Sequence, residues 1–302
     1  MGVPHNIAFV VATKDRPEEF LRLWRSLCAQ TRPPEEVVVV DASARPLPLA
    51  RLEPVPIVLR YLRAGAASAA RQRHHGLGSV GPDADHVGFL DDDAVLEPGA
   101  VAAMARFWNA AASDVGGAAF NMDNHPRPDW PFLKRSLLAE SLGLYVRRRG
   151  AVAPSGFQTM IGRVAKTTWT EWLPSGASVW RREIFREHRF DEWFDGYSYL
   201  EDLDFSYEVG KTWRLAVVSD AHYRHLPAPG GRGGGPVFGR REVLNRLHFV
   251  GKHPELSRRK CYAALLLRMA MNLALAVRDR RPSDLGRAWG NALGMTRSFI
   301  DA

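Results

Sequence analysis

Short apolar runs alternate with amphipathic segments through the first third of the chain. The runs at residues 7–12, 37–40, 57–62 and 86–90 have the length and composition of buried parallel strands. Residues 17–29, 66–77 and 98–112 have the apolar spacing or the Ala-rich composition of helices. This order predicts an α/β fold with a mixed, mostly parallel sheet flanked by helices, in the manner of doubly wound, Rossmann-like proteins.

The pattern becomes less regular after residue 114. Residues 115–121, 176–181 and 215–219 are typical of strands, and residues 200–212 of a helix. Residues 134–148 indicate a helix or an extended insert, residues 230–235 a glycine-rich loop, and the chain from residue 240 onward only helices. We therefore expect one domain over 1–239, with halves at 1–123 and 124–239, and a helical C-terminal extension over 240–302.

Composition and charge narrow the class of protein. The 302 residues are 46% hydrophobic and 25% charged, which is an ordinary balance for a globular protein. The net charge of +8 is spread along the chain, so it indicates either attraction to phosphates and other anions or simply a soluble basic surface. The two cysteines form neither a disulfide framework nor a zinc-ligand pattern, and the N-terminus lacks signal-peptide features, so a cytoplasmic location is expected.

One apolar run stands apart at residues 261–277. It carries Arg268 inside it and basic residues on both sides, at 258–260 and 278–281. The run is shorter than the roughly 20 apolar residues that a spanning helix needs. Two interpretations stay open: an amphipathic helix packed on its own domain, or peripheral contact of residues 256–281 with a membrane surface, at the inner face of the plasma membrane.

The candidate chemistry lies at the ends of predicted strands. Asp91, Asp92 and Asp93 follow the strand at 86–90, and Thr13 and Asp41 follow two earlier strands. Ligands of doubly wound sheets bind beyond the carboxyl ends of the strands. Adjacent carboxylates repel each other unless a cation or solvent offsets them, and they suit a hard divalent ion. The alternative is a solvated acidic turn that caps the next helix.

Two further groups lie later in the chain. Glu201 and Asp202 stand in an aromatic segment, where partial desolvation suits a general base, although acids at a helix start are also common. His222 and His225 follow a predicted strand, and either imidazole is a candidate metal ligand. No phosphate-binding P-loop and no dinucleotide-binding glycine motif is present, which argues against nucleotide hydrolysis and dinucleotide redox chemistry.

Taken in order, these segments resemble the family-2 glycosyltransferases of the GT-A fold. The matching motifs span about residues 5 to 255 and lie at 10–17, 37–43, 65–72, 89–93, 174–182, 190–202 and 220–225. The Gln-x-x-Arg-Trp motif of processive members is absent after Asp202, which argues for single-sugar transfer. The likeness is to non-processive, rhamnosyltransferase-like members. One departure is Ala42 after Asp41, where the family usually has a second acid.

The resemblance implies an inverting, metal-dependent transfer of one sugar from a nucleoside-diphosphate donor. It implies a UDP-, dTDP- or GDP-linked donor, Mn²⁺ or Mg²⁺, a glycan, lipid-linked or small-molecule acceptor, and no nucleic acid partner. The half at 1–123 would bind the donor and the half at 124–239 the acceptor, in polysaccharide or cell-envelope biosynthesis. The implied site residues are Asp202 as general base, Thr13, Arg16, Asp41, Arg71, Asp91 and Asp92 on the donor, and Asp91, Asp93 and His225 on the metal.

Two other functions remain open for the same sequence. A nucleotidyltransferase on a similar sheet would release pyrophosphate instead of a nucleoside diphosphate. A catalytically silent protein of the same fold would bind a nucleotide sugar, a glycan or a lipid without turnover. The presence of Glu201 and Asp202 argues against a silent protein.

Overall fold

The computed structural model describes residues 6–125, 136–196, 198–227 and 233–300. These residues form two compact units. Unit 1 contains the described residues up to 125 and those from 161 to 227, and unit 2 contains 136–160 and 233–300. The predicted boundary at 239/240 stays a prediction, and the compact units divide the chain differently because an internal segment belongs with the C-terminal helices.

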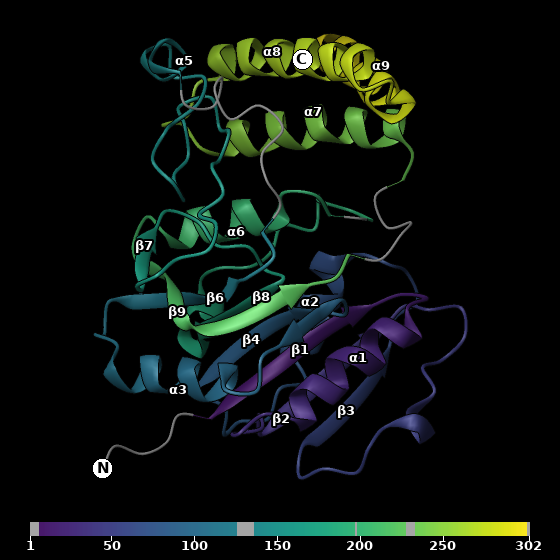
Figure 1. Ribbon diagram of the computed structural model, residues 1–302, viewed down its shortest axis with the longest axis vertical. Helices are drawn as coiled ribbons and strands as arrows, with labels where there is room; N and C mark the ends of the chain where they lie inside the picture. Colours follow the sequence, from purple (N-terminus) through teal and green to yellow (C-terminus); the bar gives the residue numbers. More distant parts are fainter. Residues whose placement is uncertain (1–5, 126–135, 197, 228–232, 301–302) are drawn as a thin grey trace. The chain divides into compact units, whose positions relative to one another are not determined.

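Unit 1 is built on one mixed sheet, seen in the lower part of Figure 1. The strands run in the order β3-β2-β1-β4-β8-β6-β9-β5, and β7 also pairs with β9. Their bounds are β1 Ile7–Thr13, β2 Glu36–Asp41, β3 Val58–Arg63, β4 His86–Asp91, β5 Ala94–Leu96, β6 Val115–Met122, β7 Thr168–Thr170, β8 Ala177–Arg181 and β9 Arg214–His225. Strands β3, β2, β1 and β4 are parallel to one another, whereas β8 runs antiparallel to β4 and β6.

Helices cover both faces of this sheet. Their bounds are α1 Pro17–Cys28, α2 Ala69–Leu77, α3 Ala100–Ala110 and α6 Glu201–Val209, with short 3-10 turns at Leu49–Arg51 and Arg182–Arg186. Alternate residues of each strand point to opposite faces. In β1, Phe9 packs with α1 and α3 on one face, whereas Val10 packs with α2 and α6 on the other. The strands are therefore buried on both sides, as their continuous apolar runs predict.

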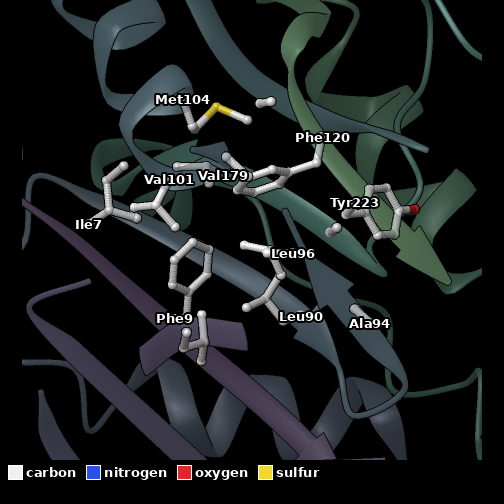
Figure 2. Close-up of a cluster of buried hydrophobic side chains, with 14 of the residues drawn as sticks. Ile7, Phe9, Leu90, Ala94, Leu96, Val101, Met104, Phe120, Val179 and Tyr223 are labelled. Carbon is white, nitrogen blue, oxygen red and sulfur yellow. The ribbon is translucent and has the colours of Figure 1, made fainter. Parts of the chain in front are cut away.

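Figure 2 shows the core on the face of α3. Phe9 of β1, Leu90 of β4 and Phe120 of β6 point toward one another, with Met104 of α3 above them. The Phe9 and Phe120 rings lie 6.2 Å apart, and Tyr223 of β9 meets Phe120 at 6.5 Å in an edge-to-face arrangement. This packing fixes the carboxyl ends of β4 and β9 relative to each other, and the candidate chemistry lies at those ends.

Most elements predicted from the sequence are confirmed, with shifts of a few residues at their ends. The exceptions are short or irregular. The three-residue strands β5 and β7 were not predicted, because too few residues show an alternating pattern. Strand β9 continues to His225 instead of ending at 219, through a register shift against β6 after Phe120. The predicted insert at 134–148 holds only the short helix α5, Leu137–Ser141, and residues 134–135 and 230–232 lie outside the described residues.

Unit 2 contains α5 and three long helices, α7 Gly235–Lys252, α8 Arg258–Arg278 and α9 Pro282–Ile300. Helix α9 contacts both α7 and α8, and α7 also contacts α8. Glu242 of α7 is buried and is bound by Arg287 and Asn291 of α9, and Arg268 of α8 lies 3.5 Å from it. Helices α7 and α9 approach so closely that a Cβ on Gly239 or Gly290 would lie 2.1 Å from a backbone oxygen of the other helix.

Candidate functional site

Asp91, Asp93 and His225 come together at the carboxyl end of β4. The three aspartates at residues 91–93 form an acidic turn. Strand β5 follows this acidic turn and pairs antiparallel with β9, which brings Ala94 opposite His225. The imidazole Nε2 of His225 lies 3.0 Å from a carboxylate oxygen of Asp93, and the backbone N–H of Leu226 donates to the Asp93 carbonyl. Of the two candidate histidines, His225 is thus the one in the cluster, and His222 instead contacts Asp123 at 2.9 Å.

These three side chains fit a divalent cation. Asp91, Asp93 and His225 each offer one ligand atom, and the three atoms lie within 4.8 Å of one another. Two atoms at that separation are both within reach of an ion whose ligand distances are about 2.1–2.4 Å. Carboxylate and imidazole donors suit Mn²⁺, Mg²⁺ or Zn²⁺ better than softer metals. Asp91 is partly exposed, so the cluster is open to solvent on that side.

Asp92 points away from this cluster and joins the acidic turn to the end of β1. Its carboxylate accepts a hydrogen bond from the Thr13 hydroxyl at 2.7 Å and one from Arg16 at 3.1 Å. Burial raises the pKa of Asp92 to about 6, and the Thr13 hydrogen bond and the Arg16 charge oppose that rise. Arg16 also lies 3.5 Å from Asp93. In this structure Thr13, Arg16 and Asp92 therefore hold the acidic turn in place.

A residue that the sequence did not single out, Arg73, connects the acidic turn to α6. Its buried guanidinium contacts Asp91 at 3.1 Å and forms a short ion pair with Glu201. It also lies over the Phe190 ring, with 5.4 Å between the guanidinium carbon and the ring centre. The predicted Arg71 points elsewhere: it is half-exposed and lies near Glu192 and Asp195. Residues two apart on a helix point about 200° apart, so only one of them reaches the cluster.

Asp202 lies at the start of α6, beside this charged cluster. Burial raises the pKa of Asp202, nearby Asp91 acts in the same direction, and the backbone N–H of Leu203 and the Arg73 charge oppose the rise. Burial also raises the pKa of Glu201, with Arg73 opposing. The chain enters α6 through Leu200, whose φ of +78° is in the left-handed region. This backbone conformation costs about 1–3 kcal/mol for a residue with a side chain. It occurs directly before Glu201 and Asp202, so it helps to set the direction of their side chains.

Gly176, at the start of β8, allows the chain to pass close to Asp91. Its carbonyl accepts a hydrogen bond from the Asp91 N–H at 2.9 Å. A Cβ at this position would lie 2.7 Å from an Asp91 carboxylate oxygen, closer than real side chains approach. The turn at 174–176, which the sequence offered only as part of a motif, is therefore shaped around the candidate metal ligand.

Asp41, at the end of β2, is fully buried and bound on all sides by protein groups. It accepts hydrogen bonds from the backbone N–H groups of Ser43 and Leu47, from the Tyr61 hydroxyl and from Arg63. Burial alone would raise its pKa, but these hydrogen bonds outweigh burial and hold the pKa of Asp41 below its usual value. In this structure Asp41 organises the loop after β2, and its predicted contact with a nucleotide stays a prediction.

A family model described as glycosyl transferase family 2 matches residues 8–187. No curated protein matches the chain by sequence. Among solved structures, the mannosyltransferase PcManGT from Pyrobaculum calidifontis, in complex with GDP-Man and Mn²⁺, is 16% identical with a TM-score of 0.58, and the match covers 97% of this chain and 89% of that one.

The S. aureus protein TarS is a second structural neighbour. Its 1–349 fragment in complex with UDP is 16% identical with a TM-score of 0.52, and the match covers 90% of this chain and 72% of that one. The chain spans 44% of the length of the longer TarS structure. At such identities the likeness shows the fold alone. Together with the family match, it confirms the predicted GT-A-like fold, with a helical extension at the C-terminus.

Proposed function

We propose that this chain, which belongs to glycosyl transferase family 2, transfers a single sugar from a nucleoside-diphosphate sugar to an acceptor hydroxyl with inversion. Membership of the family makes it a nucleotide-sugar glycosyltransferase. The observation that carries the finer proposal is the meeting of Asp91, Asp93 and His225 beside Asp202, at the carboxyl end of β4.

In the proposed reaction, Asp202 acts as the general base. Its carboxylate takes the proton of the acceptor hydroxyl while the hydroxyl oxygen forms a bond to the anomeric carbon and the bond from that carbon to the diphosphate oxygen breaks. Attack from the face opposite the leaving diphosphate inverts the anomeric configuration. A raised pKa makes Asp202 a stronger base than an exposed aspartate, which suits this role.

The diphosphate of the donor would lie over the acidic turn. A divalent ion held by Asp91, Asp93 and His225 would supply positive charge against the leaving diphosphate. Arg73 holds Asp91 and Glu201 in position, and Arg16 holds Asp92 and Asp93. Five carboxylates of Asp91, Asp92, Asp93, Glu201 and Asp202 thus face two guanidinium groups, an excess of negative charge that favours a cation over a bare phosphate.

The donor is proposed to be UDP-, dTDP- or GDP-linked, a rhamnosyl donor among them, and the acceptor a glycan, lipid-linked or small molecule. The structural neighbours were determined with UDP-GlcNAc and GDP-Man, so both a pyrimidine and a purine nucleotide stay candidates for the donor. A thermal-shift comparison of UDP, dTDP and GDP with and without Mn²⁺ is the first experiment, because a ligand that binds the native state raises the melting temperature. Stabilisation that is independent of Mn²⁺ for every nucleotide would argue against the metal site.

The decisive variant is Asp202→Asn. We expect kcat to fall by about 10²–10⁴-fold, the usual contribution of a general base, with donor binding retained. Glu208→Gln, at the other end of the same helix and on its surface, is the matched control and should leave turnover unchanged. Normal transfer by Asp202→Asn would assign the base elsewhere. Donor binding without any transfer by the wild-type chain, across the three nucleotide classes, would instead favour a silent binding protein.

A further inference from the structure

The three long helices of unit 2 pack against one another through a polar inner side. Glu242 of α7, Arg268 of α8 and Arg287 of α9 meet there, and Asn272 of α8 donates to Asn291 of α9 at 3.0 Å. The Tyr262 hydroxyl lies 3.0 Å from the Ser298 hydroxyl, so α8 and α9 are antiparallel. The inner sides of α8 and α9 are thereby fixed against α7 and against each other.

The outer side of α8 carries no charge over four turns. From residue 262 to 277, every exposed residue is apolar. These residues recur at helical spacing, so they form one stripe along the helix: Ala263, Leu266, Ala270, Leu273, Ala274 and Val277. Val277 is 82% exposed. A soluble helix normally presents charged residues on such a face, so this stripe calls for a physical explanation.

Helix α9 adds a second apolar stripe. Leu285, Trp289 and Leu293 are exposed at four-residue spacing, and Trp289 is 62% exposed. On α8, the stripe lies opposite the buried residues of that helix. On α9, each stripe residue directly precedes one of the glycines that pack on α7, so the α9 stripe lies about 100° around the helix from that contact. Neither stripe belongs to the contact with α7. Because α8 and α9 also contact each other, the stripe of α8 and the stripe of α9 are together named the two-helix apolar face.

Exposed arginines stand at both ends of this face. Arg258 and Arg259 stand at the start of α8, and Arg297 stands near the end of α9. Because α8 and α9 are antiparallel, these three arginines lie at the same end of the helix pair. At the other end lie Arg278, Arg280 and Arg281. The two acids of α9 and its preceding turn, Asp279 and Asp284, are partly buried, and Asp279 is paired with Arg278 and Arg281. Both ends of the apolar face thus carry net positive charge, although Asp279 offsets part of it at one end.

This charge arrangement selects the occupant. A second copy of the chain would bring its own arginine ends against these, because both ends of the face carry the same sign. Anionic lipid headgroups complement both ends while the apolar side chains enter the headgroup–acyl boundary. An exposed tryptophan is typical of that boundary. We propose that α8 and α9 form a docking surface that lies flat on an anionic bilayer.

Lying flat also fits the polar inner side better than spanning does. Among the described residues, α8 is the one helix that is long and apolar enough to cross a membrane, with 21 residues and a mean hydropathy of 1.4. The apolar run at 261–277, taken alone, was expected to be too short for that. Crossing would separate Arg268 and Asn272 from Glu242 and Asn291, or carry that charged network into hydrocarbon. An in-plane helix pair keeps the network intact and places only the apolar face in lipid.

Vesicle co-sedimentation of the full chain tests the surface. We expect binding to phosphatidylcholine vesicles that contain phosphatidylglycerol, and much weaker binding to phosphatidylcholine alone. The double variant Leu266→Glu/Leu273→Glu, on the α8 stripe, should lower the partition coefficient at least about tenfold, since it puts charge where lipid contact is expected. Arg280→Gln/Arg281→Gln should weaken binding only to the anionic vesicles. Val58→Glu, a 56% exposed position on strand β3 of unit 1, is the matched control.

Circular dichroism and nucleotide-induced thermal shifts verify that each variant is folded, which is expected because every changed side chain is exposed. Three results would overturn the proposal. The first is a wild-type chain that binds neither kind of vesicle. The second is a glutamate variant that binds anionic vesicles as tightly as the wild type. The third is a dimer by analytical ultracentrifugation that the glutamate variant dissociates, which would assign the face to a second copy.

Discussion

Each unit of the molecule buries a cluster of charged side chains, and the two clusters differ in balance. In unit 1, the acidic turn and the start of α6 bring five carboxylates against Arg16 and Arg73. Burial raises the pKa of Asp92, Glu201 and Asp202 there. In unit 2, one carboxylate, Glu242, faces Arg268 and Arg287. Burial would raise its pKa too, but the two arginines outweigh burial and hold the pKa of Glu242 below its usual value.

The contrast separates a site from a structural lock. The Glu242 cluster has no excess negative charge to offset, so it needs no cation, and removing its carboxylate leaves two largely buried guanidinium groups without their partner. A cluster with excess negative charge stays under electrostatic strain until protons or a cation relieve it. Burial of charged groups alone would not tell these apart. The direction of the carboxyl pKa shifts does distinguish them, and changes to the charge or the shape of either cluster test the distinction.

The largest expected effect is on unit 2. Glu242→Ala leaves Arg268 and Arg287 without their shared carboxylate, and we expect a loss of about 3–5 kcal/mol in the free energy of unfolding, measured by urea titration. Glu208→Ala removes a surface carboxylate paired with Lys211, and should cost no more than about 1 kcal/mol. Equal losses for the two variants would mean that the Glu242 network does not stabilise the fold.

Arg73→Met makes the imbalance in unit 1 larger. It leaves Glu201 and Asp91 without their buried partner, so we expect a loss of about 3 kcal/mol in the absence of metal. Mn²⁺ should restore more stability to this variant than it adds to the wild type, because a cation offsets the same carboxylates. Arg71→Met, on the outward side of α2, should change little. Mn²⁺ that stabilises the Arg73 variant no more than the wild type would contradict the shared balance.

Gly176→Ala tests the shape of the site with no change in charge. The new Cβ would collide with an Asp91 carboxylate oxygen, and overpacking of this kind costs about 1–3 kcal/mol. The affinity for Mn²⁺, measured by calorimetry, should fall, since Asp91 must move. Gly99→Ala, where a Cβ meets no atom within 4 Å, is the control. An unchanged Mn²⁺ affinity in the Gly176 variant would exclude Asp91 as a ligand.

The smallest expected effect is the change of stability with pH. Its sign is opposite for Asp92 in unit 1 and Glu242 in unit 2. The raised carboxyl pKa of Asp92 means that folded unit 1 binds more protons than the unfolded chain between about pH 4 and 6, so its stability falls as pH rises through that range. The lowered pKa of Glu242 gives unit 2 stability that is full above the usual glutamate value and is lost as pH falls through the folded value.

Hydrogen exchange read by mass spectrometry, corrected for intrinsic rates, resolves the two units in one experiment. Amides of β4 and β5 should be better protected at pH 5 than at pH 7 in metal-free protein, and amides of α7 and α9 should not. Protection that changes in the same direction in both units would contradict the opposite pKa shifts.

The fold and about half of the candidate site could be predicted from the sequence, for physical reasons. Asp91 and Asp93 could be placed because the end of an apolar parallel strand is a fixed position in this class of sheet. His225 could be placed only through the family resemblance, since its neighbour Asp93 meets it through β5, a strand of three residues. Arg73 was missed because Arg71 lies on the same short helix, and helix spacing alone does not tell which side faces the cluster.

The Glu242 network was beyond sequence reasoning for a related reason. Its members lie on three helices and are brought together only by the packing of those helices, so no local pattern marks them. The two apolar stripes are an intermediate case. The run at 261–277 was visible as apolar, but only the packing of α8 against α7 and α9 determines which of its residues remain exposed.

The backbone contact of α7 with α9 also limits how the protein can be shortened. Gly239 of α7 lies against the backbone of Arg287, and Gly290 of α9 lies against the backbone of Pro236, so this glycine seam packs backbone directly on backbone. A version that stops after α8 would uncover both this glycine seam and the carboxylate of Glu242, which α9 binds through Arg287 and Asn291. Trimmed versions made for crystallisation therefore have to keep α9 at least through Ser298.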